Sequence, residues 1–350
     1  MAAKSCPDSV YVPEDITRDI FSRLPVKSLT RFQSLSKDIP KLFKTPTFIS
    51  EHLHHSRSNP SLLCMVLSLQ RNMYLIKREM KEEPEQVNCP INLLHVCVVG
   101  SCNGLICLHH VKLSSPQVFS IWNPAKKEFR QIEPPKNKIH DFILSPGFGF
   151  SATANDYKIV ILENKVQRVY SLSRGTWRET KVQNLDDIHF PSRFYQAVSA
   201  DGALFWKNIG CLISFDIDKE VFSKIELPPG VDDTYCLRLA VYKDSIAMLH
   251  CTSDDPVVVD VWVMDEKSAT GKCSNWVKLF TVGPIPGSTL EYYPFNFWRG
   301  ELLFVKLIEG ARVSLYNFNS NKFKNLPFIP PCNIFRRWFL YVESLVPLDG

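Results

Sequence analysis

Three histidines close together, His52, His54 and His55, are a candidate set of metal ligands. A structural zinc site needs four ligands at short, regular spacings, and the chain has no Cys-x-x-Cys pair to complete such a set. We therefore expect these histidines to be solvated side chains that follow a helix. We expect no bound metal and no other cofactor.

The cysteines Cys97, Cys102 and Cys107 recur at five-residue steps, which alternate between the two faces of a strand. Core packing is therefore the expected role of these thiols. The chain has 11 cysteines that are not spaced like a compact disulfide framework. It has no N-terminal apolar segment typical of a signal peptide and no N-x-S/T site for N-glycosylation. These features favour free thiols in a reducing compartment, the cytoplasm or the nucleus.

Acid–base chemistry has one candidate set, His109 and His110 with Asp141. No nucleophile accompanies them in a recognisable context. The pair Gly147 and Gly149 is not followed by the helix that a phosphate site requires. We expect no catalytic residues, although an enzyme stays open as an alternative.

The 350 residues carry 41 Lys+Arg against 36 Asp+Glu, a formal net charge of +5. Hydrophobic content of 45% is typical of a folded chain with a sizeable core and excludes a mostly disordered one. No basic stripe is visible, so we expect no nucleic-acid partner. No window approaches 18 consecutive apolar residues, so we expect no membrane partner.

Residues 11–55 have the periodicity of short helices. Ile16, Ile20 and Leu24 recur every four residues with Phe21 beside them, which places them on one helical stripe. Pro13 suits the start of this helix, because the N–H that proline lacks would have no partner there. Three or four such helices make a very small core that needs a partner surface. Residues 1–10 are expected to be disordered.

Residues 60–348 read as short strands separated by turns. An aromatic residue recurs after a strand and a turn, at intervals of 48, 45, 54 and 47 residues: Phe129, Trp177, Phe222, Trp276 and Phe323. Four strands per unit of this length indicate the blade of a β-propeller. Five blades are readable, and strands from both ends of the segment could form a sixth, shared blade that closes the ring. The predicted fold is mainly β, a helical module followed by a propeller of six blades.

The run Arg23-Leu24-Pro25-Val26-Lys27-Ser28-Leu29, followed by Arg31-Phe32, lies within residues 12–53, and this stretch resembles a plant-type F-box. The remainder resembles the F-box-associated domain, a kelch-like propeller, that follows such F-boxes. Its matching segments are Gly100-Ser101-Cys102-Asn103-Gly104-Leu105, Trp122-Asn123-Pro124, Gly147-Phe148-Gly149-Phe150 and Tyr341-Val342-Glu343-Ser344-Leu345.

The resemblance implies the substrate-recognition subunit of a Skp–cullin–F-box ubiquitin ligase, which is not itself an enzyme. The F-box would bind a Skp-type adaptor, and through it a cullin, while the propeller binds a target protein for ubiquitination and degradation. The implied adaptor-binding residues are Pro13, Ile16, Ile20, Leu24, Pro25, Val26 and Leu29. The sequence departs from the family pattern at Ser34, Ile39 and Pro40. This leaves open a weaker adaptor contact, or a binding module that acts outside a ligase.

Target recognition is expected on the propeller face that carries the longer, more irregular loops, because binding residues concentrate on loops held by a rigid scaffold. The expected contacts are aromatic: Phe194, Tyr195, Tyr235, Tyr292 and Tyr293. Inward packing of each residue at the start of a strand is the alternative.

Overall fold

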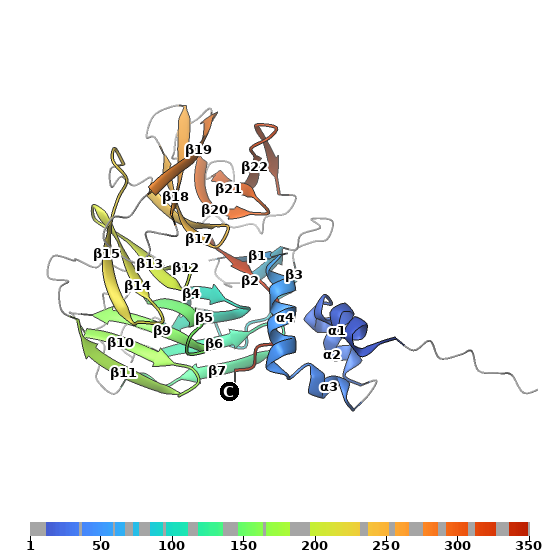
Figure 1. Ribbon diagram of the computed structural model, residues 1–350. Helices are drawn as coiled ribbons and strands as arrows, with labels where there is room; N and C mark the ends of the chain where they lie inside the picture. Colours follow the sequence, from blue (N-terminus) through green and yellow to red (C-terminus); the bar gives the residue numbers. More distant parts are fainter. Residues whose placement is uncertain are drawn as a thin grey trace, which may run out of the picture.

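The chain folds into four helices followed by six four-stranded antiparallel sheets (Figure 1). The computed structural model describes residues 12–34, 37–58, 60–66, 73–76, 85–93, 96–110, 118–135, 146–163, 166–182, 197–231, 237–251, 256–265, 276–285, 292–306, 312–326 and 336–348. The prediction of a mainly β chain with a six-bladed propeller after a helical module is confirmed. Residues 1–10, predicted to be disordered, lie outside the described ranges.

The helical module consists of α1 (Glu14–Ser22), α2 (Val26–Phe32), α3 (Ile39–Leu42) and α4 (Pro46–Arg57). Pro13 precedes the first residue of α1 and Pro25 that of α2, where a missing N–H costs nothing. Pro40 lies in the first turn of α3. The Thr45 hydroxyl accepts a hydrogen bond from the N–H of Phe48 and caps α4. Helix α4 is the longest of the four, at 12 residues.

Five sheets are meanders of strands consecutive in the chain, here called blades 2 to 6. Blade 2 consists of β4 (Val96–Cys102), β5 (Leu105–His110), β6 (Val118–Asn123) and β7 (Glu128–Ile132), and blade 3 of β8 (Gly147–Ser151), β9 (Asp156–Glu163), β10 (Val166–Ser171) and β11 (Thr176–Lys181). Blade 4 consists of β12 (Val198–Ala200), β13 (Ala203–Asn208), β14 (Cys211–Asp216) and β15 (Val221–Glu226), and blade 5 of β16 (Leu237–Tyr242), β17 (Ser245–Cys251), β18 (Val257–Met264) and β19 (Trp276–Ile285). Blade 6 consists of β20 (Tyr292–Trp298), β21 (Glu301–Lys306), β22 (Arg312–Asn317) and β23 (Lys322–Asn325).

Blade 1 is shared between the two ends of the propeller segment. It has the strand order β24 (Arg336–Tyr341), β1 (Ser61–Val66), β2 (Met73–Ile76) and β3 (Glu85–Val87). Strands β24 and β1 are antiparallel, with Ser61 opposite Tyr341 and Val66 opposite Arg336. The predicted closure of the ring by a shared blade is therefore confirmed, and it removes an edge that would otherwise be free to pair.

The repeated aromatic residues lie in the outermost strand of blades 2 to 6. Two of them join neighbouring blades through their indole N–H groups. Trp177 Nε1 donates to the carbonyl of Glu133 at 2.8 Å, and Trp276 Nε1 donates to the carbonyl of Glu226 at 2.9 Å. The period in the sequence therefore reflects packing of each blade against the one before it.

The hydrophobic core is divided among the spaces between blades. Ile121 and Phe148, for example, belong to one buried cluster formed by blades 2 and 3, and Val160 and Trp206 to another formed by blades 3 and 4. Each cluster buries side chains from two sheets, which is how a ring of blades acquires its rigidity.

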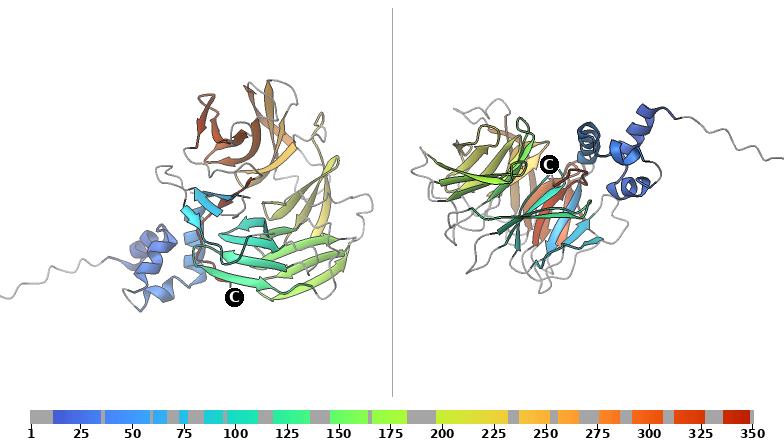
Figure 2. Two further views of the ribbon diagram at one scale, coloured as in Figure 1. Left: turned by 180° about the vertical axis from the view of Figure 1, so that it is seen from behind. Right: turned by 90° about the horizontal axis from the view of Figure 1, so that it is seen from below.

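The strand order gives the propeller two different faces. The described turns between first and second strands and between third and fourth strands are short, such as Asn103-Gly104 and Asp201-Gly202. We call this the turn face. The connections between second and third strands, and those between blades, start and end on the opposite face, here called the loop face. The helical module lies against the turn face beside blades 1 and 2 (Figure 2).

Candidate functional site

An exposed apolar stripe runs along α1 and the residues just before it. Val12, Ile16 and Ile20 are 46%, 50% and 49% exposed, and their four-residue spacing places Ile16 and Ile20 on one side of the helix. Phe21, which the sequence placed on the same stripe, instead packs inward: its ring contacts Phe32 and Phe43 at centroid distances of 5.5 and 5.6 Å. Helix α1 thus packs with one side and leaves the other uncovered by any residue that the structure describes.

Five of the seven predicted adaptor-binding residues lie on or beside this stripe. Pro13 and Pro25 are exposed, Ile16 and Ile20 are half exposed, and Leu24 is half-buried at the edge of the module's core. These residues together form the candidate docking surface.

Val26 and Leu29, the other two predicted adaptor-binding residues, lie in the core of the helical module, 1% and 0% exposed. They pack with Phe43, Phe48 and, from the far end of the chain, Leu345. We therefore assign both side chains to packing instead of docking. A short helix with apolar residues on more than one side does not reveal from its sequence which side faces inward.

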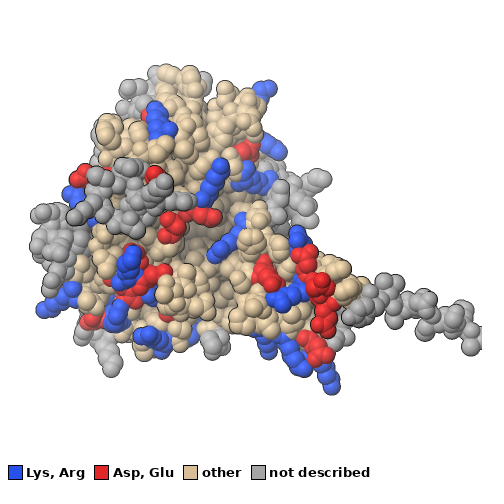
Figure 3. Space-filling model, viewed as in Figure 1, with Lys and Arg blue, Asp and Glu red and all other residues tan. Residues whose placement is uncertain are grey.

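Charged residues surround the docking surface. Glu14 and Asp15 occupy the first turn of α1, where the helix dipole favours negative charge. Arg18 joins α1 to α4 through a two-pronged contact with Glu51, with N···O distances of 2.7 Å. Figure 3 shows acidic side chains in a stripe on the helical module, whereas on the propeller face in view both signs are interspersed.

His52 is buried between α4 and the end of α1. Its Nε2 lies 3.0 Å from the carbonyl oxygen of Leu24, and its Nδ1 has no hydrogen-bond partner among the described residues. Burial lowers the pKa of His52, so the neutral ring is favoured. His54 is exposed and His55 half-buried, with ring centroids 5.8 Å apart. The expectation that these histidines are solvated and follow a helix is wrong for His52, because all three lie within α4 and His52 is buried. The three side chains occupy different environments and do not converge on one point.

Three of the five predicted target-binding residues, Phe194, Tyr195 and Tyr235, lie outside the described ranges. Tyr292 is described only by its backbone, at the start of β20. Tyr293, the next residue, is half-buried at the end of β20 that lies toward the loop face. The guanidinium carbon of Arg238, on β16, lies 4.2 Å from the centre of its ring.

Sequence reasoning missed Arg238 and the neighbouring ring pair Phe295–Trp338, whose centroids are 5.7 Å apart. These residues come from the innermost strands of blades 5, 6 and 1. Only the prediction that aromatic side chains follow the long inter-blade loops pointed toward this part of the propeller. The arrangement can stack on an apolar or planar group of a ligand.

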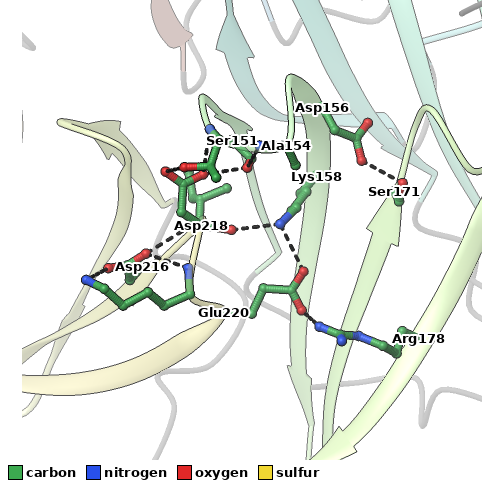
Figure 4. Close-up of polar contacts among 12 residues, drawn as sticks. Ser151, Ala154, Asp156, Lys158, Ser171, Arg178, Asp216, Asp218 and Glu220 are labelled. Carbon is green, nitrogen blue, oxygen red and sulfur yellow. Dashed lines mark hydrogen bonds and ion pairs between the residues drawn. The ribbon is translucent and has the colours of Figure 1, made fainter.

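A polar cluster joins blades 3 and 4 on the turn face (Figure 4). Lys158 Nζ donates to the carbonyl of Ile217 at 2.8 Å and to Glu220 at 2.9 Å, and Arg178 completes an ion pair with Glu220. Asp218 accepts hydrogen bonds from the hydroxyls of Ser151, at 2.5 Å, and Thr153. These bonds connect two blades and leave the cluster internally paired, so we assign it to fixing the blades together.

Hydrogen bonds from Ser151 and Thr153 hold the pKa of Asp218 below its usual range, although slight desolvation of this exposed carboxylate opposes them. Burial lowers the pKa of Lys158, while the nearby Asp156 opposes this change. The hydrogen bonds of Lys158 to Ile217 and Glu220, and those that Asp218 accepts from Ser151 and Thr153, supply each group with polar partners.

The residues considered for acid–base or thiol chemistry pack inside blade 2. The ring of His109 stacks on Phe119 at 4.6 Å, and His110 Nε2 lies 3.0 Å from the hydroxyl of Ser120. Asp141 lies outside the described residues. Burial raises the pKa of Cys102 to about 12 and that of Cys107 well above its ordinary value. Both thiols are thus unreactive at neutral pH, in keeping with packing.

The described part of the chain contains no group of three or more His, Cys, Asp or Glu residues arranged to hold a metal ion. Its longest helix has 12 residues, and no described helix is long and apolar enough to cross a bilayer.

Comparison with known proteins identifies the family. Residues 55–328 match the model of the F-box associated beta propeller domain. F-box protein CPR1 of Arabidopsis thaliana is 26% identical over an alignment that covers 96% of this chain and 88% of CPR1. F-box/LRR-repeat/kelch-repeat protein At2g27520 of the same plant is 27% identical over 96% of this chain and 97% of that protein. The four N-terminal helices fit the F-box that these relatives are named for. The chain therefore belongs to the family of F-box proteins with an F-box-associated β-propeller.

Proposed function

We propose that the chain is the target-recognition subunit of a Skp–cullin–F-box ubiquitin ligase. The observation that carries this proposal is the uncovered apolar stripe on α1 of an F-box that is joined to a propeller. Such a subunit makes and breaks no bond itself. It acts by holding target lysines at high effective concentration near a charged ubiquitin-conjugating enzyme.

The adaptor would dock on the α1 stripe, with Pro13, Ile16, Ile20 and Pro25 in contact and Leu24 at the edge. These side chains supply the exposed apolar area that a protein interface needs at its centre. Val26 and Leu29 would contribute indirectly, by holding α2 against the rest of the F-box. The complex would work in the cytoplasm or the nucleus.

The target protein would bind on the loop face, away from the adaptor. The F-box contacts the turn face through Asn103 and Ala125, so an adaptor on α1 leaves the loop face free. Within the described residues, Tyr293 with Arg238 is the candidate contact on that side. Phe194, Tyr195, Tyr235 and Tyr292 stay proposed contacts that flank it in the sequence.

A double variant of the full chain, Ile16→Lys with Ile20→Lys, tests the adaptor interface. Burying two ammonium groups against an apolar partner should weaken binding to a purified Skp-type adaptor about a hundredfold or more by calorimetry. Val277→Lys is the matched control, because Val277 is 48% exposed but lies on β19 of the propeller. Adaptor binding that is equal in the double variant and the control would rule out the α1 surface.

A second candidate function is a binding module that acts without a ligase. The observation that favours it is the shortness of α3, four residues that begin at Ile39 and include Pro40. Failure of the unmodified chain to bind any Skp-type adaptor would support this alternative. A propeller enzyme is the third and weakest candidate, and elemental analysis of the purified protein for a bound metal tests it.

A further inference from the structure

The chain continues past the last strand of the propeller in a segment, residues 342–348, that we call the C-terminal segment. It has no regular secondary structure, yet Ser344, Leu345 and Leu348 are 0%, 6% and 3% exposed. A seven-residue extension would be expected to fray unless both sides hold it. The contacts of this segment go to both the F-box and the propeller.

Two contacts join the C-terminal segment to the F-box. The Glu343 carboxylate accepts a hydrogen bond from the N–H of Val26 at 2.9 Å, at the start of α2, where that N–H has no partner within the helix. Pro25, the preceding residue, has no side chain that could do this. The Leu345 side chain then completes the core of the F-box between Val26, Phe43 and Phe48.

The same segment is fixed to blade 2 by a separate set of contacts. Asn123 Nδ2 donates to the carbonyls of Ser344 and Val346, at 3.0 and 2.9 Å. The N–H of Leu348 donates to Glu128 at 3.1 Å, and its carbonyl accepts from Arg130 at 3.1 Å. Buried carbonyls bonded by side chains in this way leave the backbone little freedom to move.

The close approach of the β4–β5 turn completes the attachment. Gly104 has a φ of +82°, and a Cβ added there would lie 2.2 Å from the Cβ of Ser344. The neighbouring residue Asn103 accepts a hydrogen bond from Arg57 at the end of α4, at 2.7 Å. Several of the segments that identify the family in the sequence therefore meet at this one joint: the Asn103-Gly104 turn, Asn123 and residues 343–345.

We propose that the C-terminal segment is a positioning clamp that holds the F-box and the propeller in one relative orientation, with Glu343 and Leu345 as its positioning residues. Among the described residues, the other contacts between the two parts are the Arg57 hydrogen bond and the packing of Ala125, beside the covalent connection through α4. Parts of one chain with so small an interface move relative to each other by default. Under the proposed function, on which the purpose of this clamp rests, a fixed orientation sets how far the target lies from the adaptor.

The test measures the distance between the two parts in the full chain without any adaptor. Fluorophores on noncanonical amino acids replace Lys44 in the F-box and Lys219 in blade 4, both exposed, so that the native cysteines stay unlabelled. Single-molecule energy transfer should give one narrow distance distribution in the parent chain. Glu343→Ala and Leu345→Ala should broaden it, and Glu343→Gln, which keeps an acceptor oxygen, should restore most of the narrow distribution.

Pro347→Ala is the control variant, because Pro347 is exposed within the same segment. Leu345→Ala leaves a cavity in a small core. If this variant unfolds the F-box, the result for Glu343→Ala alone decides the test. In Glu343→Ala, helical circular dichroism should be unchanged, while the Val26 amide exchanges with solvent on the order of tenfold faster or more. A distribution as narrow in Glu343→Ala as in Pro347→Ala would overturn the clamp.

Adaptor binding is measured separately on the same variants. If Glu343→Ala broadens the distance distribution but the parent chain binds no Skp-type adaptor, the clamp is supported and the ligase role is refuted. A narrow distribution in Glu343→Ala with normal adaptor binding would refute the clamp and leave the ligase role standing.

Discussion

The F-box and the propeller bury their apolar residues in opposite ways. The F-box has one small core, centred on Leu29 and Phe48, and it borrows Leu345 and Ala125 from the propeller to complete it. The propeller divides its core among the spaces between six sheets, each supported from both sides. A small module that leaves one side of α1 exposed, and that needs side chains from the rest of the chain to complete its core, is suited to binding a partner. A ring of blades that support one another is suited to holding loops in fixed positions.

Phe48→Ala should show the largest difference between the two regions. Phe48 is 0% exposed, and its removal is expected to cost about 3–5 kcal/mol, as much as a core of this size supplies. The F-box should unfold while the propeller stays folded. Hydrogen exchange followed by mass spectrometry checks this, with protection lost in α1 to α4 and kept in β4 to β23.

Leu315→Ala is the matched change in the propeller, because Leu315 is also 0% exposed, in β22. It should lower the free energy of propeller unfolding by about 2–5 kcal/mol without removing the hydrogen-exchange protection of the F-box. If Phe48→Ala abolishes protection in both regions, the two form a single cooperative unit and the contrast drawn here is wrong.

Gly104→Ala and Gly202→Ala separate backbone strain from steric conflict at the joint. Both glycines have a positive φ, +82° and +70°, so either alanine costs about 1–2 kcal/mol in that conformation. Only at Gly104 would the new methyl group also meet Ser344 and the carbonyl oxygen of Val342, at 2.2 and 2.8 Å. Denaturant unfolding should therefore show a loss for Gly104→Ala that is larger by about 1–3 kcal/mol. Equal losses would mean that the C-terminal segment moves aside freely.

The sequence predicted those features that depend on local pattern or on repetition. The recurring Trp177 and Trp276 revealed the blades because each one makes the same contact with the blade before it. The shared blade could be predicted because a strand such as β24, left over after five complete units, has few other places to pair. Periodicity on α1 likewise predicted the stripe of Ile16 and Ile20.

The joint could not be predicted, because its contacts connect residues far apart in the sequence. Glu343 meets the N–H of Val26 across 317 residues, and only the closure of the ring brings them together. Val26 and Leu29 are buried in a cluster that includes Leu345, so part of the core around them comes from the far end of the chain. No local pattern distinguishes an apolar side chain that binds a partner protein from one that packs against the C-terminal segment of the same chain.

The two regions should also respond to acid at different pH values, beginning with His52 in the F-box. Burial lowers the pKa of His52 in the folded state, so the unfolded state binds the proton more readily. Its stabilising contribution is complete above the ordinary histidine pKa of about 6.5 and is lost as the pH falls from there toward the lowered folded value. The charged or titratable groups that act on it are Glu343 and His55.

Replacement of His52 by Gln keeps a donor for the Leu24 carbonyl and removes the titration. The parent F-box should lose stability as the pH falls below about 6.5, and His52→Gln should lose less over the same range. Helical circular dichroism during denaturant titration at each pH measures this. Equal slopes in the two proteins would show that His52 is protonated as easily when folded as when unfolded.

Asp218 should confer the smallest effect, in the propeller and at lower pH. Hydrogen bonds from Ser151 and Thr153 lower its pKa in the folded state, so its contribution is present above the ordinary aspartate pKa of about 4. That contribution is lost as the pH falls below about 4, through the lowered folded value. Because Asp218 is exposed, Asp218→Asn should cost less than about 1 kcal/mol at neutral pH, and the difference from the parent should disappear in acid. Propeller unfolding followed at neutral pH and at a pH well below the ordinary aspartate pKa decides this. A difference that persists in acid would mean that the substituted amide fails to pack, not that a charge was lost.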